Sequence, residues 1–248
     1  MQINIIYDLS VANAPAGFKT GVMDAVAYLE KEFTNPITIT IAVGYGEVDG
    51  SLLGNGDLGA SYYPVGEPES YSAVVNALKA ENAPGAFALP STSPLPSNYN
   101  LYVSPAEAKA LGLPLSVPDG GIDGYVGFSS VPNTFSYAGG SVPPANEYYF
   151  IGVVEHEISE IMGRISLLGD PTPDYSVIDL FRYSSPGVRD TTTAGLNSTA
   201  YFSIDNGNTT LGSWNNQISN GDLADWYPQG PAPGGNDAVL RPGFETRG

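Results

Sequence analysis

The sequence contains no cysteine among its 248 residues and only one histidine. The lack of cysteine excludes disulfides, thiolate nucleophiles and thiolate metal ligands. Lysine and arginine total 9 against 26 aspartate and glutamate residues, so the formal net charge is -17. Phosphate backbones and anionic headgroups repel a chain of this charge. We therefore expect no nucleic acid and no membrane surface as partners.

Long apolar runs are absent as well. No run of about 18 apolar residues occurs, so we expect no membrane span. Residues 1 to 20 lack a basic segment followed by an apolar one, which a signal peptide requires. The many Gly, Pro and Tyr residues and the few Lys residues are typical of secreted bacterial proteins. We therefore expect an extracellular protein whose signal peptide is not present in this chain.

The first 45 residues predict a strand, an amphipathic helix and a second strand. "INIIYD" at 3–8 is short and β-branched, and 18–33 repeats apolar residues at helical spacing. Residues 37–45 alternate apolar with small or polar residues, which is the period of a strand. This order favours an α+β fold with an α/β-like N-terminal part. The glycine-rich 46–66 predicts a hairpin or loop.

Three further elements follow before the histidine. Residues 69–81 have helical spacing, and 125–130 is a short strand candidate. A short helix at 104–112 carries its own start signal, because Ser104 can cap its N-terminus and Glu107 can close a capping box. After residue 163 the periodicity weakens, so we expect short elements joined by turns.

The histidine lies in "EYYFIGVVEHEISEIMG", at 147–163. Helical spacing puts four apolar residues of this segment on one stripe, and Gly163 supplies a stop that tolerates positive φ. The stripe consists of Phe150, Val154, Ile158 and Ile161. The histidine is therefore expected on a buried helix.

On that helix His156 and Glu160 are one turn apart, so their side chains can share one metal ion. Glu157 is rotated by about 100° from His156. This is the spacing of HExxH zinc hydrolases, in which the middle glutamate takes a proton from water, except that a carboxylate replaces the second histidine. The alternative is a partly buried histidine paired with Glu160, with Glu155 and Glu157 in solvent.

A catalytic zinc needs a third protein ligand, and no second histidine can supply it. We favour Asp179, because an acid between Ile178 and Leu180 is hard to explain as facing solvent. An Asp179 that pairs with Arg182 or caps a turn is an equal alternative. The candidates that follow the helix are Asp170, Asp174, Asp179 and Tyr183.

Tyr183 is also a candidate catalytic residue, because its hydroxyl could donate to a developing oxyanion. Arg164 or Arg182 could do the same. A packed tyrosine with a satisfied hydroxyl is the favoured alternative for Tyr183.

The ligand chemistry predicts zinc, with competition from harder ions. One imidazole and two carboxylates make the site formally neutral around a divalent ion, so its Lewis acidity falls. Calcium is a second candidate, as a structural ion in the loops 119–124, 205–208 and 220–225. Turns are the favoured interpretation of these loops.

The chain resembles a family of secreted bacterial metalloproteases with an HExxE signature, similar to metzincins. The resemblance implies one catalytic domain over 1–248, with an N-terminal subdomain at 1–165 and an irregular C-terminal subdomain at 166–248. It also implies a twisted mixed sheet with two backing helices above the active-site helix, and an edge strand at 125–129 that could pair with a peptide. The resemblance lies in 3–8, 42–48, 102–113, 123–130, 150–166, 175–189 and 201–205.

The metzincin pattern HExxHxxGxxH falls on His156, Glu157, Glu160, Gly163 and Ser166, so two of its histidines are replaced. The function that the resemblance implies is a metal-dependent endopeptidase acting on a protein or peptide substrate. The alternative is a non-catalytic secreted binding protein on a degenerate peptidase scaffold. A glycan or surface-adhesion module is a third option, suggested only by the 16 tyrosines.

Overall fold

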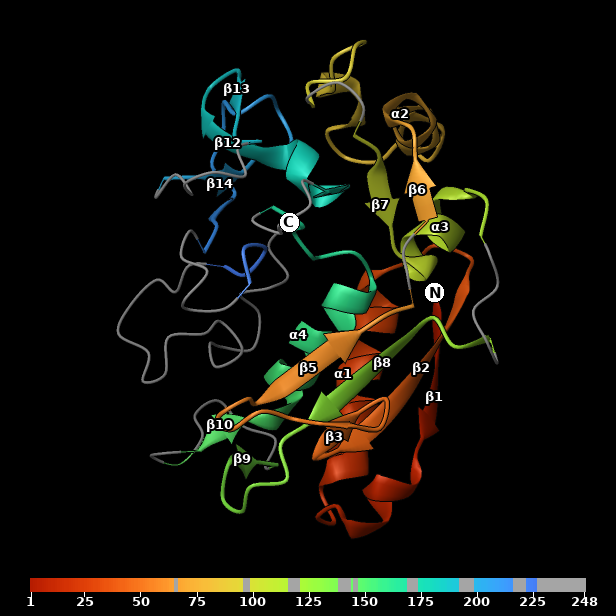
Figure 1. Ribbon diagram of the computed structural model, residues 1–248, viewed down its shortest axis with the longest axis vertical. Helices are drawn as coiled ribbons and strands as arrows, with labels where there is room; N and C mark the ends of the chain where they lie inside the picture. The colour runs from red at the N-terminus through yellow and green to blue at the C-terminus, as the bar shows by residue number, and fades with distance from the viewer. Residues whose placement is uncertain are drawn as a thin grey trace. The chain divides into compact units, whose positions relative to one another are not determined.

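The computed structural model describes nine stretches of the chain, and within them the protein has the expected α+β composition (Figure 1). The chain forms two compact units, one from 1–65 with 116–162 and one from 66–115 with 163–237. Residues 66–115 thus belong with the later part of the chain, and not with the N-terminal subdomain that the sequence predicts. The described residues are 1–64, 67–95, 99–115, 121–137, 144, 147–168, 174–191, 199–215 and 222–226.

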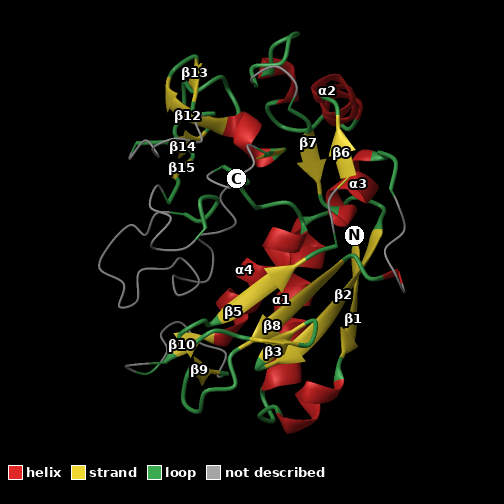
Figure 2. Cartoon of the chain, viewed as in Figure 1, coloured by secondary structure: helices red, strands yellow, loops and turns green. Residues whose placement is uncertain are grey.

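The first unit is built on a four-stranded mixed sheet in the order β1-β2-β8-β5 (Figure 2). Strands β1 (Gln2–Tyr7), β2 (Thr38–Tyr45) and β8 (Gly124–Phe128) run parallel. Strand β5 (Gly59–Tyr62) pairs with β8 in the antiparallel direction. The strands predicted at 3–8, 37–45 and 125–130 are confirmed, whereas β5 lies in the segment predicted as hairpin or loop.

Two helices, α1 (Phe18–Glu32) and α4 (Phe150–Ile161), pack on one face of this sheet. The ring of Phe18 lies 5.9 Å from that of Phe128 and 5.0 Å from that of Phe150, so strand and helices share one aromatic core. The helices approach closely because a Cβ on Gly21 would stand 2.6 Å from the Phe150 ring. The core therefore fixes α4 against the sheet.

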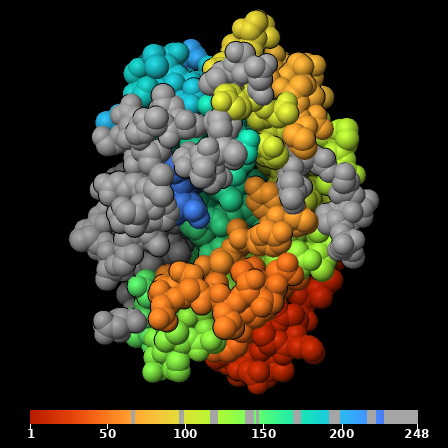
Figure 3. All heavy atoms as spheres, in the orientation of Figure 1, coloured from red at the N-terminus to blue at the C-terminus, as the bar shows by residue number. Residues whose placement is uncertain are grey.

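The other elements of the first unit are short. A 3-10 helix η1 (Leu9–Asn13) follows β1, and β9 (Phe135–Ser136) pairs with β10 (Tyr148–Tyr149) just before α4. Strands β3 (Glu47–Val48) and β4 (Ser51–Leu52) form a hairpin. The segment carrying β3, β4 and β5 is exposed on the face drawn in Figure 3, where its residues are orange.

Strand β8 is not the edge strand that the sequence predicts. It lies between β2 and β5, so both of its sides are hydrogen-bonded. Strand β5 is at the edge of the sheet instead. The error arises because Gly59, Ala60 and Ser61 lack the β-branched alternation by which a strand is recognised in sequence.

The second unit has two small sheets around its own apolar core. One sheet has the order β11-β7-β6, and the other is antiparallel with the order β13-β12-β14-β15. The expected short elements after residue 163 are thus present. The strands are β6 (Glu67–Glu69), β7 (Leu101–Val103), β11 (Tyr175–Ser176), β12 (Arg182–Ser185), β13 (Val188–Arg189), β14 (Tyr201–Phe202) and β15 (Gly212–Ser213).

Helices of the second unit are α2 (Tyr71–Ala80), α3 (Pro105–Leu111) and the 3-10 helices η2 (Ala86–Ala88) and η4 (Ile178–Phe181). The capping box of α3 is confirmed, with Ser104 and Glu107 each accepting from the other's backbone N–H. Both helices predicted for this region, at 69–81 and 104–112, are confirmed within a few residues.

No helix in the described parts of the chain is long and apolar enough to cross a membrane.

Glu107 should make stability depend on pH. Burial is the largest cause raising its pKa, to about 8 from 4.5, and it outweighs the hydrogen bond from the Ser104 N–H. Because the folded protein binds this proton more tightly than the unfolded chain, Glu107 stabilises the fold below about pH 4.5 and loses that contribution as the pH rises through 8.

We expect the free energy of unfolding of Glu107→Gln, measured in urea, to fall less than that of the wild type between these pH values. The exposed Glu81→Gln serves as the control. Identical pH slopes for wild type and Glu107→Gln would contradict the prediction.

Candidate metal centre

Helix α4 carries three buried ionisable side chains beside its apolar stripe. The exposed fractions of His156, Glu157 and Glu160 are 7%, 5% and 3%. The predicted stripe is confirmed, since all four of its residues are fully buried. A helix with an apolar face against the sheet thus also removes one imidazole and two carboxyl groups from water, which is costly without compensating partners.

His156 and Glu160 face each other across one turn of α4. Their nearest atoms, His156 Nε2 and Glu160 Oε1, are 3.1 Å apart. Two ligands bound to one tetrahedral zinc at about 2.0–2.1 Å would be separated by about 3.3 Å. The pair therefore has the atom types and the separation that a shared divalent ion requires.

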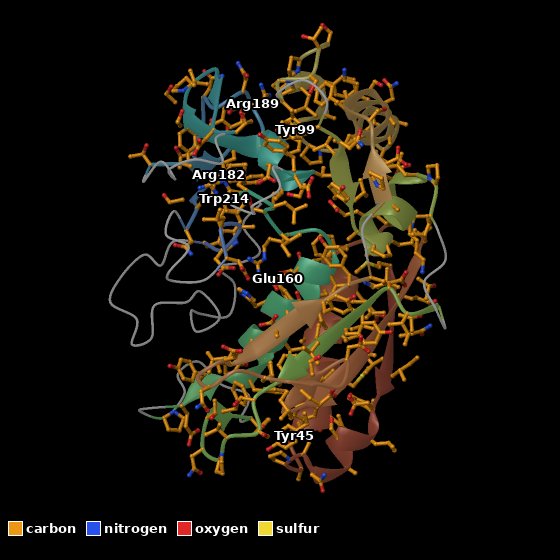
Figure 4. The ribbon with its side chains drawn as sticks, in the orientation of Figure 1. Tyr45, Tyr99, Glu160, Arg182, Arg189 and Trp214 are labelled. Carbon is orange, nitrogen blue, oxygen red and sulfur yellow. The ribbon has the colours of Figure 1, made fainter. Side chains whose placement is uncertain are left out.

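Strand β5 contacts both glutamates of the motif. Glu160, labelled on α4 in Figure 4, accepts a hydrogen bond of 2.7 Å at its Oε2 from the hydroxyl of Ser61. Glu157 packs against Gly59, where an added Cβ would stand 2.5 Å from its Oε1. Neither partner could be predicted from the sequence, because residues 59–62 lack the pattern of a strand.

The alternative of a His156 that pairs with Glu160, with Glu155 and Glu157 in solvent, is met in its pair, whose nearest atoms are 3.1 Å apart. Glu155 is partly exposed, as this alternative requires, but Glu157 is buried. A carboxyl group held at 5% exposure on an otherwise apolar helix needs a specific environment. The burial of Glu157 distinguishes this helix from an ordinary acidic surface helix.

Asp179 lies in the second unit, in η4, and is buried. Its carboxylate accepts hydrogen bonds from the hydroxyl of Ser166 at 2.5 Å and from the N–H and hydroxyl of Ser176 at 2.8 and 2.9 Å. Burial raises its pKa, and these hydrogen bonds oppose that rise. The bonds to Ser176 give Asp179 the turn-capping role that sequence analysis held as an alternative, while its role as a metal ligand stays a prediction.

Tyr183 is also in the second unit, in β12, and only 1% of it is exposed. The guanidinium of Arg189 lies 4.9 Å from the centre of its ring, and the Tyr201 ring is 6.4 Å away. Burial raises its pKa. These contacts are those of a packed tyrosine, and its catalytic role stays a prediction.

The two arginines named with Tyr183 have partners in the second unit. Arg182 donates to the Leu223 carbonyl at 2.8 Å, and Arg164 donates to the Ala224 carbonyl at 2.9 Å. Arg164 also forms an ion pair of 3.1 Å with Asp225. Both guanidinium groups therefore hold the chain around residues 223–225.

Asp225 is a candidate ligand that sequence analysis did not single out. It is 4% exposed, and its second carboxylate oxygen accepts a hydrogen bond of 3.0 Å from the Asp222 N–H. The sequence placed it only in the calcium candidate 220–225, because nothing local indicates that an aspartate in such a turn is buried. Among the described residues of the first unit, His156 and Glu160 are buried groups that could hold a metal ion. Asp225 is a buried carboxylate of the second unit.

The calcium candidate at 205–208 is a turn. Asp205 accepts from Ser203 at 2.7 Å and from the Thr209 N–H at 2.8 Å, and Asn206 and Gly207 have positive φ. These hydrogen bonds lower the pKa of Asp205 to about 2. Asp170 and parts of the loops 119–124 and 220–225 lie outside the described residues.

No known protein family, curated protein or solved structure matches this chain.

Asp179→Ala should destabilise the protein. The change would leave buried donors of Ser166 and Ser176 without their acceptor, which we expect to lower the free energy of unfolding by about 3 kcal/mol. Urea unfolding in the presence of a chelator measures this without any contribution from metal. Asp24→Ala, at an exposed position of α1, is the control, and equal stability of the two variants would contradict a structural role for Asp179.

Proposed function

We propose that the protein is a secreted metal-dependent endopeptidase of metzincin-like fold, with zinc as its metal. The observation that carries the proposal is the buried pair of His156 and Glu160 with a buried Glu157 on the same helix. The mixed sheet with α4 packed on one face supports the fold assignment. It differs from the expectation of two backing helices, because α1 is the one α-helix besides α4 in the described residues of the first unit.

His156 Nε2 and Glu160 Oε1 are the first two ligands in this proposal. For the third we propose Asp225, a buried acid of the second unit, in preference to Asp179. Chain connectivity supports this choice, since Arg164 is only four residues beyond Glu160 and forms an ion pair with Asp225. Metal-binding carboxylates are commonly hydrogen-bonded by such neighbours, whereas the Asp179 carboxylate is already occupied by serine donors.

A bound divalent ion would supply Lewis acidity that makes a water molecule more acidic. Glu157 is the group of this chain that accepts the proton. It is one residue from His156 and buried, so its carboxylate lies where water is scarce and proton transfer to a defined acceptor is favoured. In the proposed reaction Glu157 then delivers that proton to the amine released from the cleaved peptide bond.

The proposed substrate is an extended peptide. Strand β5 is at the edge of the sheet and its Gly59 and Ser61 contact the two glutamates, so a peptide that pairs with β5 would lie beside α4. Main-chain hydrogen bonds to an edge strand recognise an extended backbone independently of its side chains. An edge strand beside the glutamates therefore supports an endopeptidase more than a hydrolase of small molecules.

A non-catalytic binding protein with a structural metal is the second candidate. The proposed ligands favour this candidate, because two carboxylates and one imidazole neutralise a divalent ion and reduce its Lewis acidity. A less acidic ion activates water less well. In this case the ion would have no open position for water.

Two substitutions on α4 separate the roles of its residues. Glu157→Gln should retain about one zinc per chain and lower the cleavage rate of a peptide library by at least about 100-fold, because the proton acceptor is lost. His156→Ala should lose the zinc together with the activity. Elemental mass spectrometry and peptide cleavage measure the two quantities. Loss of zinc in Glu157→Gln would mean that Glu157 is a ligand, and a wild type that binds zinc without cleaving any peptide would favour the binding protein.

Matched Asp→Asn substitutions test the third ligand. Asp225→Asn should weaken zinc binding by at least about 10-fold, because the neutral amide oxygen is a poor zinc ligand. Asp179→Asn makes the same change at the competing position and should leave zinc affinity close to that of the wild type. The reverse pattern would assign the third ligand to Asp179.

A further inference from the structure

Two residues of the edge strand β5, Gly59 and Ser61, face helix α4. Gly59 pairs with Phe128 and Ser61 pairs with Val126 in the register of β5 and β8. Phe128 and Val126 are fully buried in the core beneath α4. Because side chains opposite each other point to the same face, Gly59 and Ser61 both face the helix that carries the motif.

Each of these two residues meets a different glutamate. Ser61 donates its hydroxyl hydrogen to Glu160 Oε2 at 2.7 Å, while the other oxygen of that carboxylate lies 3.1 Å from His156 Nε2. The hydroxyl therefore restrains one oxygen and turns the other toward the imidazole. Gly59 has no side chain, and the space this leaves is filled by Glu157.

We infer that β5 positions both carboxylates of the site, with Ser61 orienting Glu160 as a metal ligand and Gly59 admitting Glu157 to its buried position. The inference rests on the proposed function, since it gives Ser61 and Gly59 roles in the same metal centre. Both act through a glutamate of α4, so they are positioning residues. The strand proposed to bind the peptide is thereby the strand that sets the geometry of the metal centre.

Zinc affinity tests the role of Ser61, with the dissociation constant measured by competition with a chromogenic chelator. Ser61→Val and Ser61→Thr have side chains of the same shape, and only threonine keeps the hydroxyl. We expect about 10-fold weaker zinc binding in Ser61→Val, the lower end of the range for such ligand-orienting groups, and near wild-type binding in Ser61→Thr. Ser51→Ala, at an exposed position in the β3–β4 hairpin, is the control for loss of a serine hydroxyl.

The outcomes separate this inference from the proposed function. Equal zinc affinity in Ser61→Val and Ser61→Thr would overturn the role of Ser61 while leaving the metal centre intact. No zinc binding by the wild type would overturn the proposed function first. The metal-free Ser61→Val and Ser61→Thr variants should have the same midpoint of thermal unfolding, because their side chains have the same shape.

Gly59→Ala tests the second half of the inference. Its Cβ would stand 2.5 Å from Glu157 Oε1 and 2.8 Å from Glu157 Cδ, so the carboxyl group must move. We expect zinc affinity to be retained while kcat falls by at least about 10-fold, because proton acceptance depends on position. In a double-mutant cycle, Glu157→Ala should remove the loss of thermal stability caused by Gly59→Ala, since the collision disappears. Additive losses in that cycle would overturn the role of Gly59.

Discussion

The structure of the first unit depends on how α4 buries ionisable groups on a helix that must also pack against a sheet. Phe150, Ile158 and Ile161 are fully buried, yet His156 and Glu160 on the same helix are almost as inaccessible. The free energy of burying an uncompensated carboxylate is several kcal/mol. Glu160 accepts a hydrogen bond from Ser61, and its 3.1 Å separation from His156 would in addition allow a cation shared by the carboxylate and the imidazole.

This constraint explains why the residues of β5 that contact the two glutamates of α4 are small. An aromatic core of Phe18, Phe128 and Phe150 holds the N-terminal half of the helix, and Gly21 permits the close approach of α1 there. Toward the C-terminal half, the partners are Gly59 and Ser61 of β5. Bulky apolar residues at these two positions would close the space that the carboxyl groups occupy. Thus the core fixes the helix and the edge strand leaves room for its polar side chains.

Local sequence was sufficient to predict an element wherever the pattern that identifies it lies within one segment of the chain. The strands around α1, the capping box of α3 and the buried stripe of α4 depend on residues within the same segment, and all were predicted. Strand β5 was not, because its conformation is stabilised by pairing with β8, about 65 residues later in the chain. The division into units was missed for the same reason, since 66–115 packs with residues from 163 onward.

The candidate ligands are where local sequence is least informative. The apolar neighbours Ile178 and Leu180 correctly predicted that Asp179 is buried. A buried carboxylate can, however, be satisfied by hydroxyl and amide donors, and Ser166 and Ser176 provide them. For Asp225 the sequence did not predict burial, because it stands in an ordinary turn sequence. In the structure its carboxylate is buried and lies next to the guanidinium of Arg164. Burial alone therefore does not identify a ligand. The two acids differ in their partners, since Asp179 accepts from the hydroxyls of Ser166 and Ser176, whereas Asp225 pairs with Arg164 and accepts from the Asp222 N–H. The kind of partner, and not burial, is therefore what a ligand assignment has to weigh.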